Sequence, residues 1–353
     1  QYKLKMAYLS RKGDESLSNV FVLRTEENRL SSQFVTVIEP RGTKAVVTSA
    51  QRLKVKTDVD CEMQNEKCKM KNAKSEDGAF DPVCLQVKRK GGTDLIIMQP
   101  GYSGRVVEAE GFSTDAAYAV ATLSAGRPKR VTLFGGTCAR IGDVALKLNA
   151  ATLRGKIGAV DRARRTVRIE GFSGKLNLAG QRIRFHNRRH SAMYTIVSAQ
   201  ALTDGAWELT LDFDSVIGAG KVTGVADGIL KSRGQMVFAG LTAKGDGTFV
   251  DRYSEYAGAT VENASGRGAF VIRGITGIIA YYNQPHDVHI DREAHSEANE
   301  ATLRKSYPEG SEFFVYDYGV GDEAEVLNWA TATKSGDSWE VRSVGEACRV
   351  SIG

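Results

Sequence analysis

The fold of this chain is decided by a stretch that alternates strictly between apolar and polar side chains, Trp207-Glu208-Leu209-Thr210-Leu211-Asp212-Phe213-Asp214. Successive side chains of a β-strand point to opposite faces of a sheet. The stretch therefore places its tryptophan, leucines and phenylalanine on one face and its carboxylates and threonine on the other. This period of two predicts a half-buried strand whose apolar row faces a core.

The same alternation recurs along the chain. It is present at residues 53–55, 83–87, 167–169, 183–185, 339–341 and 348–352. Gly91-Gly92 predicts a hairpin turn between strands at 83–89 and 94–98, and Asp204-Gly205 predicts a turn before Trp207. Helix-forming residues gather only at 294–304, before Pro308. Many strands without intervening helices predict an all-β, antiparallel fold with almost no helix.

Two β units are expected. Residues 58–81 are polar and interrupt the early strands, which is typical of an exposed loop. After about residue 150 the strands become shorter and glycine more frequent. We therefore expect an antiparallel β-sandwich over residues 1–150 and a second, smaller β-rich unit over residues 151–353. No fixed-period repeat is present, which argues against a propeller or solenoid.

Composition and motifs exclude several classes of protein. The chain has 353 residues, of which 42% are hydrophobic and 25% charged, values typical of a globular protein. No apolar run reaches the roughly 18 residues of a membrane helix, and no hydrophobic signal segment opens the sequence. The net charge of +6 comes with short basic clusters and no nucleic-acid module, so neither a membrane nor a nucleic acid is an expected partner. Phosphate-loop, dinucleotide-binding, nucleophile-elbow and zincin motifs are missing from the sequence.

The five cysteines leave two alternatives open. An odd number excludes complete intramolecular pairing. Cys61 and Cys68 flank a polar stretch and could form a small surface disulfide in an oxidising compartment, or stay free.

One run is dense in potential metal ligands. His286, His289 and His295 lie within ten residues that also contain three carboxylates. Neutral imidazole and ionised carboxylate are ligands for Zn²⁺ or Mn²⁺, so these three histidines are the candidate ligands of a divalent metal. The competing interpretation is a polar loop, because His286 and His289 would point to opposite faces of a strand.

A second group is a candidate carbohydrate site. His186, Arg188 and Arg189 follow a predicted strand and could hold a carboxylate or sulfate, because guanidinium groups make bidentate contacts with such anions. Trp329 and Tyr316 could stack on sugar rings. The alternatives are a solvated hairpin tip for the basic residues and core packing for the aromatic ones. A tyrosine beside a histidine would suit proton transfer in a β-elimination, but the sequence does not pair them.

The N-terminal third resembles a known family. Residues 18–24, 32–40, 83–87 and 93–97 are similar to the β-sandwich region of heparinase II/III-like polysaccharide lyases. Residues 183–187, 194–196 and 315–322 look like the C-terminal β extension of some members. The resemblance implies β-elimination on an acidic, uronic-acid-containing polysaccharide such as a glycosaminoglycan, and a periplasmic or extracellular location.

The resemblance does not supply catalytic residues. In that family an α/α toroid precedes the sandwich and contributes the catalytic tyrosine, whereas this sequence has no helical half and its first histidine is His186. We therefore assign no catalytic residue and expect the chain to be the β-sheet portion of such a lyase, serving as scaffold and substrate-contacting wall for a helical catalytic domain or chain. The alternatives are a stand-alone carbohydrate-binding module and a structural interface domain.

Overall fold

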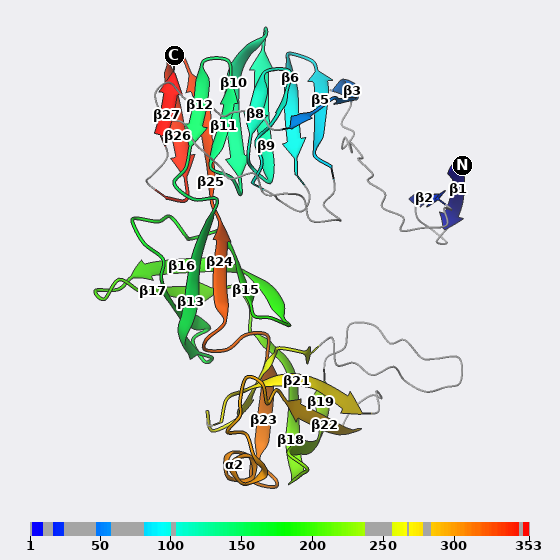
Figure 1. Ribbon diagram of the computed structural model, residues 1–353, viewed down its shortest axis with the longest axis vertical. Coiled ribbons are helices and arrows are strands. Elements are labelled where there is room, and N and C mark those ends of the chain that lie inside the picture. The colour runs from blue at the N-terminus through cyan, green and yellow to red at the C-terminus, as the bar shows by residue number, and fades with distance from the viewer. Residues whose placement is uncertain are drawn as a thin grey trace.

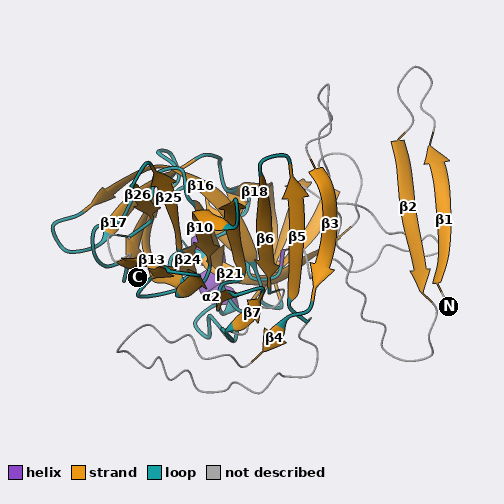
Figure 2. Ribbon diagram, turned by 90° about the horizontal axis from the view of Figure 1, so that it is seen from above, coloured by secondary structure: helices purple, strands orange, loops and turns teal. Residues whose placement is uncertain are grey.

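The computed structural model describes residues 2–9, 17–24, 47–57, 81–99, 104–236, 256–266, 268–277, 284–345 and 349–352. Every strand pair in these ranges is antiparallel, and Figure 2 shows the short helix α2 (Glu300–Ser306) among the strands. The expected all-β fold class is confirmed. The helix of the described ranges is too short and too polar to span a bilayer.

Two sheets make a β-sandwich around the first core. Its strands are β3 (Val47–Leu53), β4 (Lys56–Thr57), β5 (Val83–Arg89), β6 (Gly92–Met98), β7 (Val107–Ala109), β8 (Phe112–Thr114), β9 (Tyr118–Ser124), β10 (Arg127–Phe134), β11 (Cys138–Ile141), β12 (Val144–Lys147), β25 (Trp329–Ser335), β26 (Ser338–Ser343) and β27 (Arg349–Ile352). One sheet has the order β26-β25-β10-β9-β6-β5-β3 and the other β27-β12-β11-β8-β7-β4. A separate two-stranded sheet pairs β1 (Tyr2–Leu9) with β2 (Leu17–Arg24).

The sandwich core consists of the inward rows of both sheets. Ile97, Phe112, Leu133 and Leu146 are fully buried there. Cys84 lies in the same core as a free thiol, and burial raises its pKa to about 11. The predicted turn at Gly91-Gly92 joins β5 to β6, as expected.

The second unit is a closed six-stranded barrel, here called barrel 1. Its strands are β13 (Thr152–Asp161), β14 (Thr166–Glu170), β15 (Arg182–His186), β16 (Ser191–Ala201), β17 (Trp207–Leu211) and β24 (Glu323–Leu327), in the order β13-β14-β17-β16-β15-β24. The alternating stretch 207–214 supplies β17, whose tryptophan and leucines are buried. Phe213 is exposed instead of buried because the strand ends at Leu211, and the Asp212 carboxylate then accepts a bond from the Thr195 N–H.

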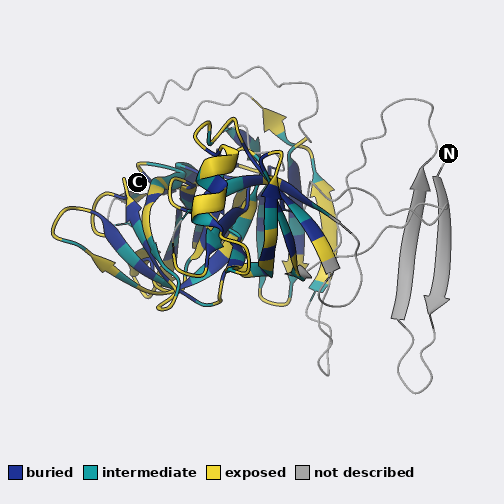
Figure 3. Ribbon diagram, turned by 90° about the horizontal axis from the view of Figure 1, so that it is seen from below, coloured by how far each residue is buried: buried dark blue, intermediate teal, exposed yellow. Residues whose placement is uncertain are grey.

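The third unit, barrel 2, is also closed and six-stranded. It contains β18 (Val216–Ala226), β19 (Ile229–Met236), β20 (Thr260–Asn263), β21 (Phe270–Gly277), β22 (Gln284–Ile290) and β23 (Glu312–Tyr316), in the order β18-β19-β22-β21-β20-β23. Helix α2 (Glu300–Ser306) buries Leu303 and leaves most of its surface exposed (Figure 3). It begins later than the expected residue 294 because Asn299 caps it through the Thr302 N–H, while residues 291–298 turn around Asp291.

The three units are nested (Figure 1). The chain runs from the sandwich through β13–β17 into barrel 2, returns to barrel 1 with β24, and re-enters the sandwich with β25–β27. The first crossing lies near the expected boundary at residue 150. The single second unit expected over residues 151–353 differs from this arrangement, because it divides into two barrels and its last strands pair with β10 and β12. The alternation of side chains along one strand does not show which distant strand it pairs with, so these pairings could not be predicted from local sequence.

Some expectations concern residues that are not described. Most of the polar stretch 58–81, the Cys61–Cys68 pair, Cys348 and residues 32–40 of the family resemblance lie outside the described ranges.

Candidate functional site

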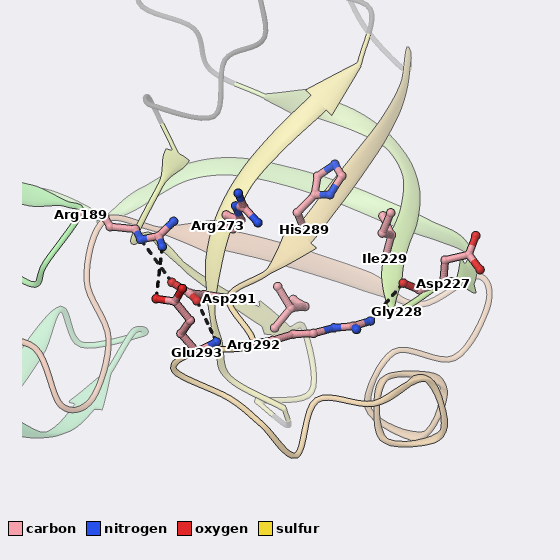
Figure 4. Close-up of a pocket in the computed structure, with 10 residues that line it drawn as sticks. Arg189, Asp227, Gly228, Ile229, Arg273, His289, Asp291, Arg292 and Glu293 are labelled. Carbon is pink, nitrogen blue, oxygen red and sulfur yellow. Dashed lines mark hydrogen bonds and ion pairs between the residues drawn. The ribbon is translucent and has the colours of Figure 1, made fainter.

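A cavity of about 280 Å³ opens on barrel 2, beside the β15–β16 hairpin of barrel 1 (Figure 4). It is lined by the β18–β19 turn, the end of β22, the middle of β21 and the residues that follow β22. Four of its side chains are basic or can become so, Arg189, Arg273, Arg292 and His289, and three are acidic, Asp227, Asp291 and Glu293. The site therefore places guanidinium groups around an open concave surface.

The strand register places His289 on β22 and Arg273 on β21 next to each other in the pocket wall. His289 on β22 pairs with Ile229 on β19 and with Gly274 on β21. Arg273 is the extra residue of a β-bulge between Ile272 and Gly274. A bulge redirects a side chain that regular alternation would place elsewhere, so Arg273 reaches the pocket from an irregular position.

A tight turn fixes Arg292 at the other side of the pocket. Asp227 and Gly228 both have positive φ, 54° and 69°, as two-residue hairpins with a right-handed twist require. The Arg292 guanidinium donates to the Asp227 carbonyl oxygen over 3.1 Å. A Cβ atom on Gly228 would collide with that guanidinium, so the missing side chain makes room for Arg292.

The β15–β16 hairpin carries Arg189 to barrel 2. The Asn187 side-chain oxygen accepts hydrogen bonds from the N–H groups of Arg189 and His190, each over 3.0 Å. The Asn187 amide group donates to the Gly258 carbonyl oxygen of barrel 2 over 2.7 Å. The tip of the hairpin is thereby held against the barrel whose pocket it completes.

The acidic side chains set the electrostatics of the pocket. Arg189 Nε lies 3.4 Å from Asp291 Oδ2, and its Nη2 lies 3.6 Å from Glu293 Oε2. Arg188 Nη1 is 3.1 Å from the same Glu293 oxygen. The Asp291 side chain is only 10% exposed, whereas that of Glu293 is 72% exposed. Glu293 is thus an exposed carboxylate in a place where the carboxylate or sulfate of a ligand would meet two arginines.

The five residues expected to bind carbohydrate do not converge. Arg189 lines the pocket and Arg188 borders it through Glu293. His186 ends β15 in barrel 1, opposite Glu323. The Trp329 indole N–H donates to Gln181 over 2.8 Å. Tyr316 is buried, with the Arg162 guanidinium 3.9 Å above its ring, which agrees with the core alternative.

The three histidines expected to bind metal also lie apart. His286 is buried, and burial lowers its pKa. His289 Nε2 is 2.8 Å from Thr276 Oγ1 in the pocket wall. His295 Nε2 accepts from the Val271 N–H, and its Nδ1 contacts Glu297. None of the three belongs to a group of metal-binding side chains within the described ranges.

One group in the described ranges has the composition of a metal site. His186, Glu323 and Glu325 each offer one ligand atom, and these atoms lie within 4.8 Å of one another. No local sequence pattern indicates this group, because the histidine and the two glutamates lie on strands far apart along the chain.

A tyrosine and a histidine both contact Asp317, in a partly buried network. Asp317 Oδ2 accepts from the Tyr194 hydroxyl over 2.8 Å, and Asp317 Oδ1 is 3.0 Å from His190 Nε2. Burial and the Asp317 carboxylate raise the pKa of Tyr194 well above its ordinary value. Such a hydroxyl is poorly suited to removing a proton from a sugar ring.

Comparisons of the chain with models of protein families, with curated proteins and with solved structures found no match. The geometry therefore carries the functional argument. Of the residues that line the pocket, Arg189 was expected to bind carbohydrate and His289 to bind a metal, whereas Arg273 and Arg292 were not among the expected site residues. Arg292 lies inside the ligand-dense run 286–295, and its neighbours Asp291 and Glu293 are the only hint that could have drawn attention to it.

Proposed function

We propose that this chain is the β-sheet portion of a polysaccharide lyase acting by β-elimination on an acidic, uronic-acid-containing polysaccharide, and that it serves mainly as scaffold and substrate-contacting wall. A helical catalytic domain or chain would supply the reacting groups. A lyase of this kind, for example one acting on a glycosaminoglycan, would be periplasmic or extracellular. The family resemblance of the N-terminal third motivates the reaction class, and the pocket on barrel 2 supports the contact with substrate.

The observation that carries the proposal is the arginine-lined pocket with its exposed Glu293. Guanidinium groups bind carboxylates and sulfates through paired N–H donors. The largely buried Asp291 carboxylate lies 3.4 Å from Arg189 Nε, so a ligand carboxylate that displaces Glu293 meets a guanidinium group that Asp291 already holds in place. A chain of uronic acids offers one such carboxylate at each acidic residue.

The scaffold role is supported by the state of Tyr194. Tyr194 and His190 are linked by the Asp317 carboxylate that lies between them. The raised pKa of Tyr194 disfavours the phenolate that proton abstraction needs. We assign catalysis to the helical catalytic domain or chain.

A stand-alone carbohydrate-binding module is the second candidate. The specific observation in its favour is that barrel 2 and one hairpin of barrel 1 complete the pocket without any further domain. This candidate predicts polysaccharide binding without any cleavage in the presence of a helical partner.

Binding of alginate to the full-length chain, with neutral dextran as a reference, tests the contact with substrate. We expect Arg189→Ala to weaken alginate binding about tenfold, because one charge-assisted contact is lost. Glu293→Gln should tighten it by about three- to tenfold, because a competing carboxylate is removed. Arg342→Ala and Glu340→Gln remove the same charges from an exposed ion pair on β26 and should leave binding unchanged. Equal effects from both pairs of variants would mean that only net charge matters, and would contradict a pocket.

The lyase assignment is tested by the ultraviolet absorbance of the unsaturated uronate product. We expect product when the chain is combined with its helical partner and none from the chain alone. Product formed by the chain alone would contradict the scaffold role, and binding without product in either case would favour the binding module.

A further inference from the structure

His186, Glu323 and Glu325 form a cluster on the surface of barrel 1 whose geometry is independent of the proposed lyase function. His186 ends β15 and Glu323 begins β24, and the two residues face each other directly in the strand register. Glu325 is two residues further along β24, so its side chain leaves the sheet on the same face. Two adjacent strands thus present one imidazole and two carboxylates together.

The distances within the cluster differ from those of hydrogen bonds. His186 Nε2 lies 3.4 Å from Glu325 Oε2 and 3.6 Å from Glu323 Oε2. An N–H···O hydrogen bond is usually about 2.9 Å long. With metal–ligand bonds of about 2.0–2.1 Å, neighbouring ligand atoms of a tetrahedral zinc site are about 3.4 Å apart. The two separations from the imidazole are therefore close to the edges of such a tetrahedron.

The imidazole nitrogen that faces the carboxylates is buried and makes no hydrogen bond in the structure. A buried nitrogen without a partner is costly, which is why such atoms usually have one. A cation between Nε2 and the two carboxylate oxygens would satisfy all three atoms at once.

Two arginines lie beside Glu325, one near each carboxylate oxygen, and the one near Oε2 is too distant for a hydrogen bond. Arg154 Nε contacts the other oxygen of Glu325, Oε1, over 3.3 Å. Arg184 donates its Nε proton to Ser191 Oγ over 2.9 Å, and its Nη1 is 3.7 Å from Glu325 Oε2. The Arg154 side chain is 75% exposed, so it can adjust when a cation binds. Arg154 also holds the Glu325 carboxylate in place, as residues outside the ligand shell do in many metal sites.

From this geometry we propose that His186, Glu323 and Glu325 bind a Zn²⁺-class divalent cation that fastens β15 to β24. One nitrogen and two oxygens are three protein ligands, and water on the exposed side of Glu323 completes the tetrahedron. Imidazole favours Zn²⁺ over Mg²⁺ or Ca²⁺, and Mn²⁺ binds more weakly at the same ligands. The cation would connect a strand on the way to barrel 2 with the strand that returns from it.

Calorimetric titration of Zn²⁺ into the EDTA-treated full-length chain tests this site. We expect one ion per chain and a higher unfolding temperature with Zn²⁺ than with EDTA, because a ligand bound only by the folded state stabilises it. His186→Ala and Glu323→Gln should each weaken binding at least about 100-fold, since loss of outer contacts alone costs 10–100-fold. Co²⁺ should give the intense visible spectrum of a tetrahedral ion in the unmodified chain and lose it in both variants.

Two controls keep the test decisive. Glu208→Gln removes the same charge from an exposed site on β17 and should leave Zn²⁺ binding unchanged. His289→Ala removes a histidine of the other candidate group and should also leave it unchanged. Glu323 is largely exposed, so Glu323→Gln should fold normally, which circular dichroism can verify. Absence of Zn²⁺ binding, or binding that survives in both His186→Ala and Glu323→Gln, would overturn the proposal.

Discussion

Arg162 connects the two barrels through an ion pair, a hydrogen bond and a ring contact. Its Nη2 lies 2.6 Å from Glu262 Oε1 of barrel 2 and donates to the Tyr318 carbonyl oxygen over 2.8 Å. The same guanidinium stacks on the Tyr316 ring, 3.9 Å from its centre. The side chains of Arg162 and Glu262 are only 16% and 18% exposed. A largely buried ion pair of this kind is costly to break, because removing one partner leaves the other charge with little access to water.

We therefore expect Arg162→Ala to lower the free energy of unfolding by about 3 kcal/mol. Urea unfolding followed by circular dichroism measures this change. Arg164→Ala, three residues from the end of β13, removes an arginine whose partner Asp161 lies at the surface, and should cost less than about 1 kcal/mol. Equal losses of unfolding free energy in the two variants would show that burial of the Arg162 ion pair does not add to its contribution to stability.

The β18–β19 turn shows how one short element controls the pocket. Asp227 and Gly228 both adopt positive φ, and Gly228 leaves room for the Arg292 guanidinium. The turn before β17 provides a comparison, because Gly205 also has positive φ, 84°, but a Cβ there would meet no atom within 4 Å. The two glycines share the backbone requirement and differ in what surrounds them.

Gly205→Ala and Gly228→Ala should both lower the free energy of unfolding by about 1–2 kcal/mol, the usual cost of a left-handed backbone for a residue with a Cβ. Only Gly228→Ala should also weaken alginate binding, because the new methyl group displaces Arg292 from the pocket. Thermal unfolding and the alginate titration separate these effects. Weakened binding in Gly205→Ala as well would mean that general destabilisation, and not displacement of Arg292, is responsible.

For individual strands and turns, the sequence predicted the features that depend only on neighbouring residues. The Gly91-Gly92 hairpin and the strand at Trp207 follow from turn chemistry and alternation, and both are present. The helix was expected near its true position, but its start was missed because the Asn299 cap depends on one side-chain bond. The β-bulge that redirects Arg273 was not predictable, since it depends on the partner strand.

The whole molecule is organised as insertions within insertions. Barrel 2 leaves and re-enters barrel 1 through β18 and β23, and Val216 at the start pairs with Tyr316 at the end. Paired residues of antiparallel strands have Cα atoms about 4.5–5.5 Å apart. The two ends of barrel 2 are therefore adjacent, and a short linker can span them at little entropic cost.

We expect that replacing residues 216–316 with a short Gly-Ser linker leaves the sandwich and barrel 1 folded, because each unit has its own buried core. Circular dichroism should retain the strand signal, and thermal unfolding should stay cooperative. Alginate binding should be lost with the pocket, while Zn²⁺ binding should persist because its ligands lie in barrel 1. An aggregated or unfolded product would show that barrel 1 needs barrel 2 to fold.

The residues of the candidate sites come from strands that are far apart in the sequence, so local patterns could not predict that they would meet. The ligand-dense run 286–295 does line the pocket. It contributes Arg292 and the carboxylates of Asp291 and Glu293, and its three histidines do not form a cluster there. The histidine that does face carboxylates, His186, meets them only because β24 returns from barrel 2 to pair with β15. No local pattern could join these residues, since their proximity depends on strand order.

Alternation of side chains and the conformations of turn residues act over a few neighbouring positions, so the amino-acid sequence alone was enough to establish that this protein is built from antiparallel sheets. The closure of the sheets into a sandwich and two nested barrels, and the choice of which charged side chains meet, became visible only in the folded chain. Strand pairing is specified by whole buried faces packing together, so the partner of each strand, and every site made from two partners, is settled when the chain folds as a unit.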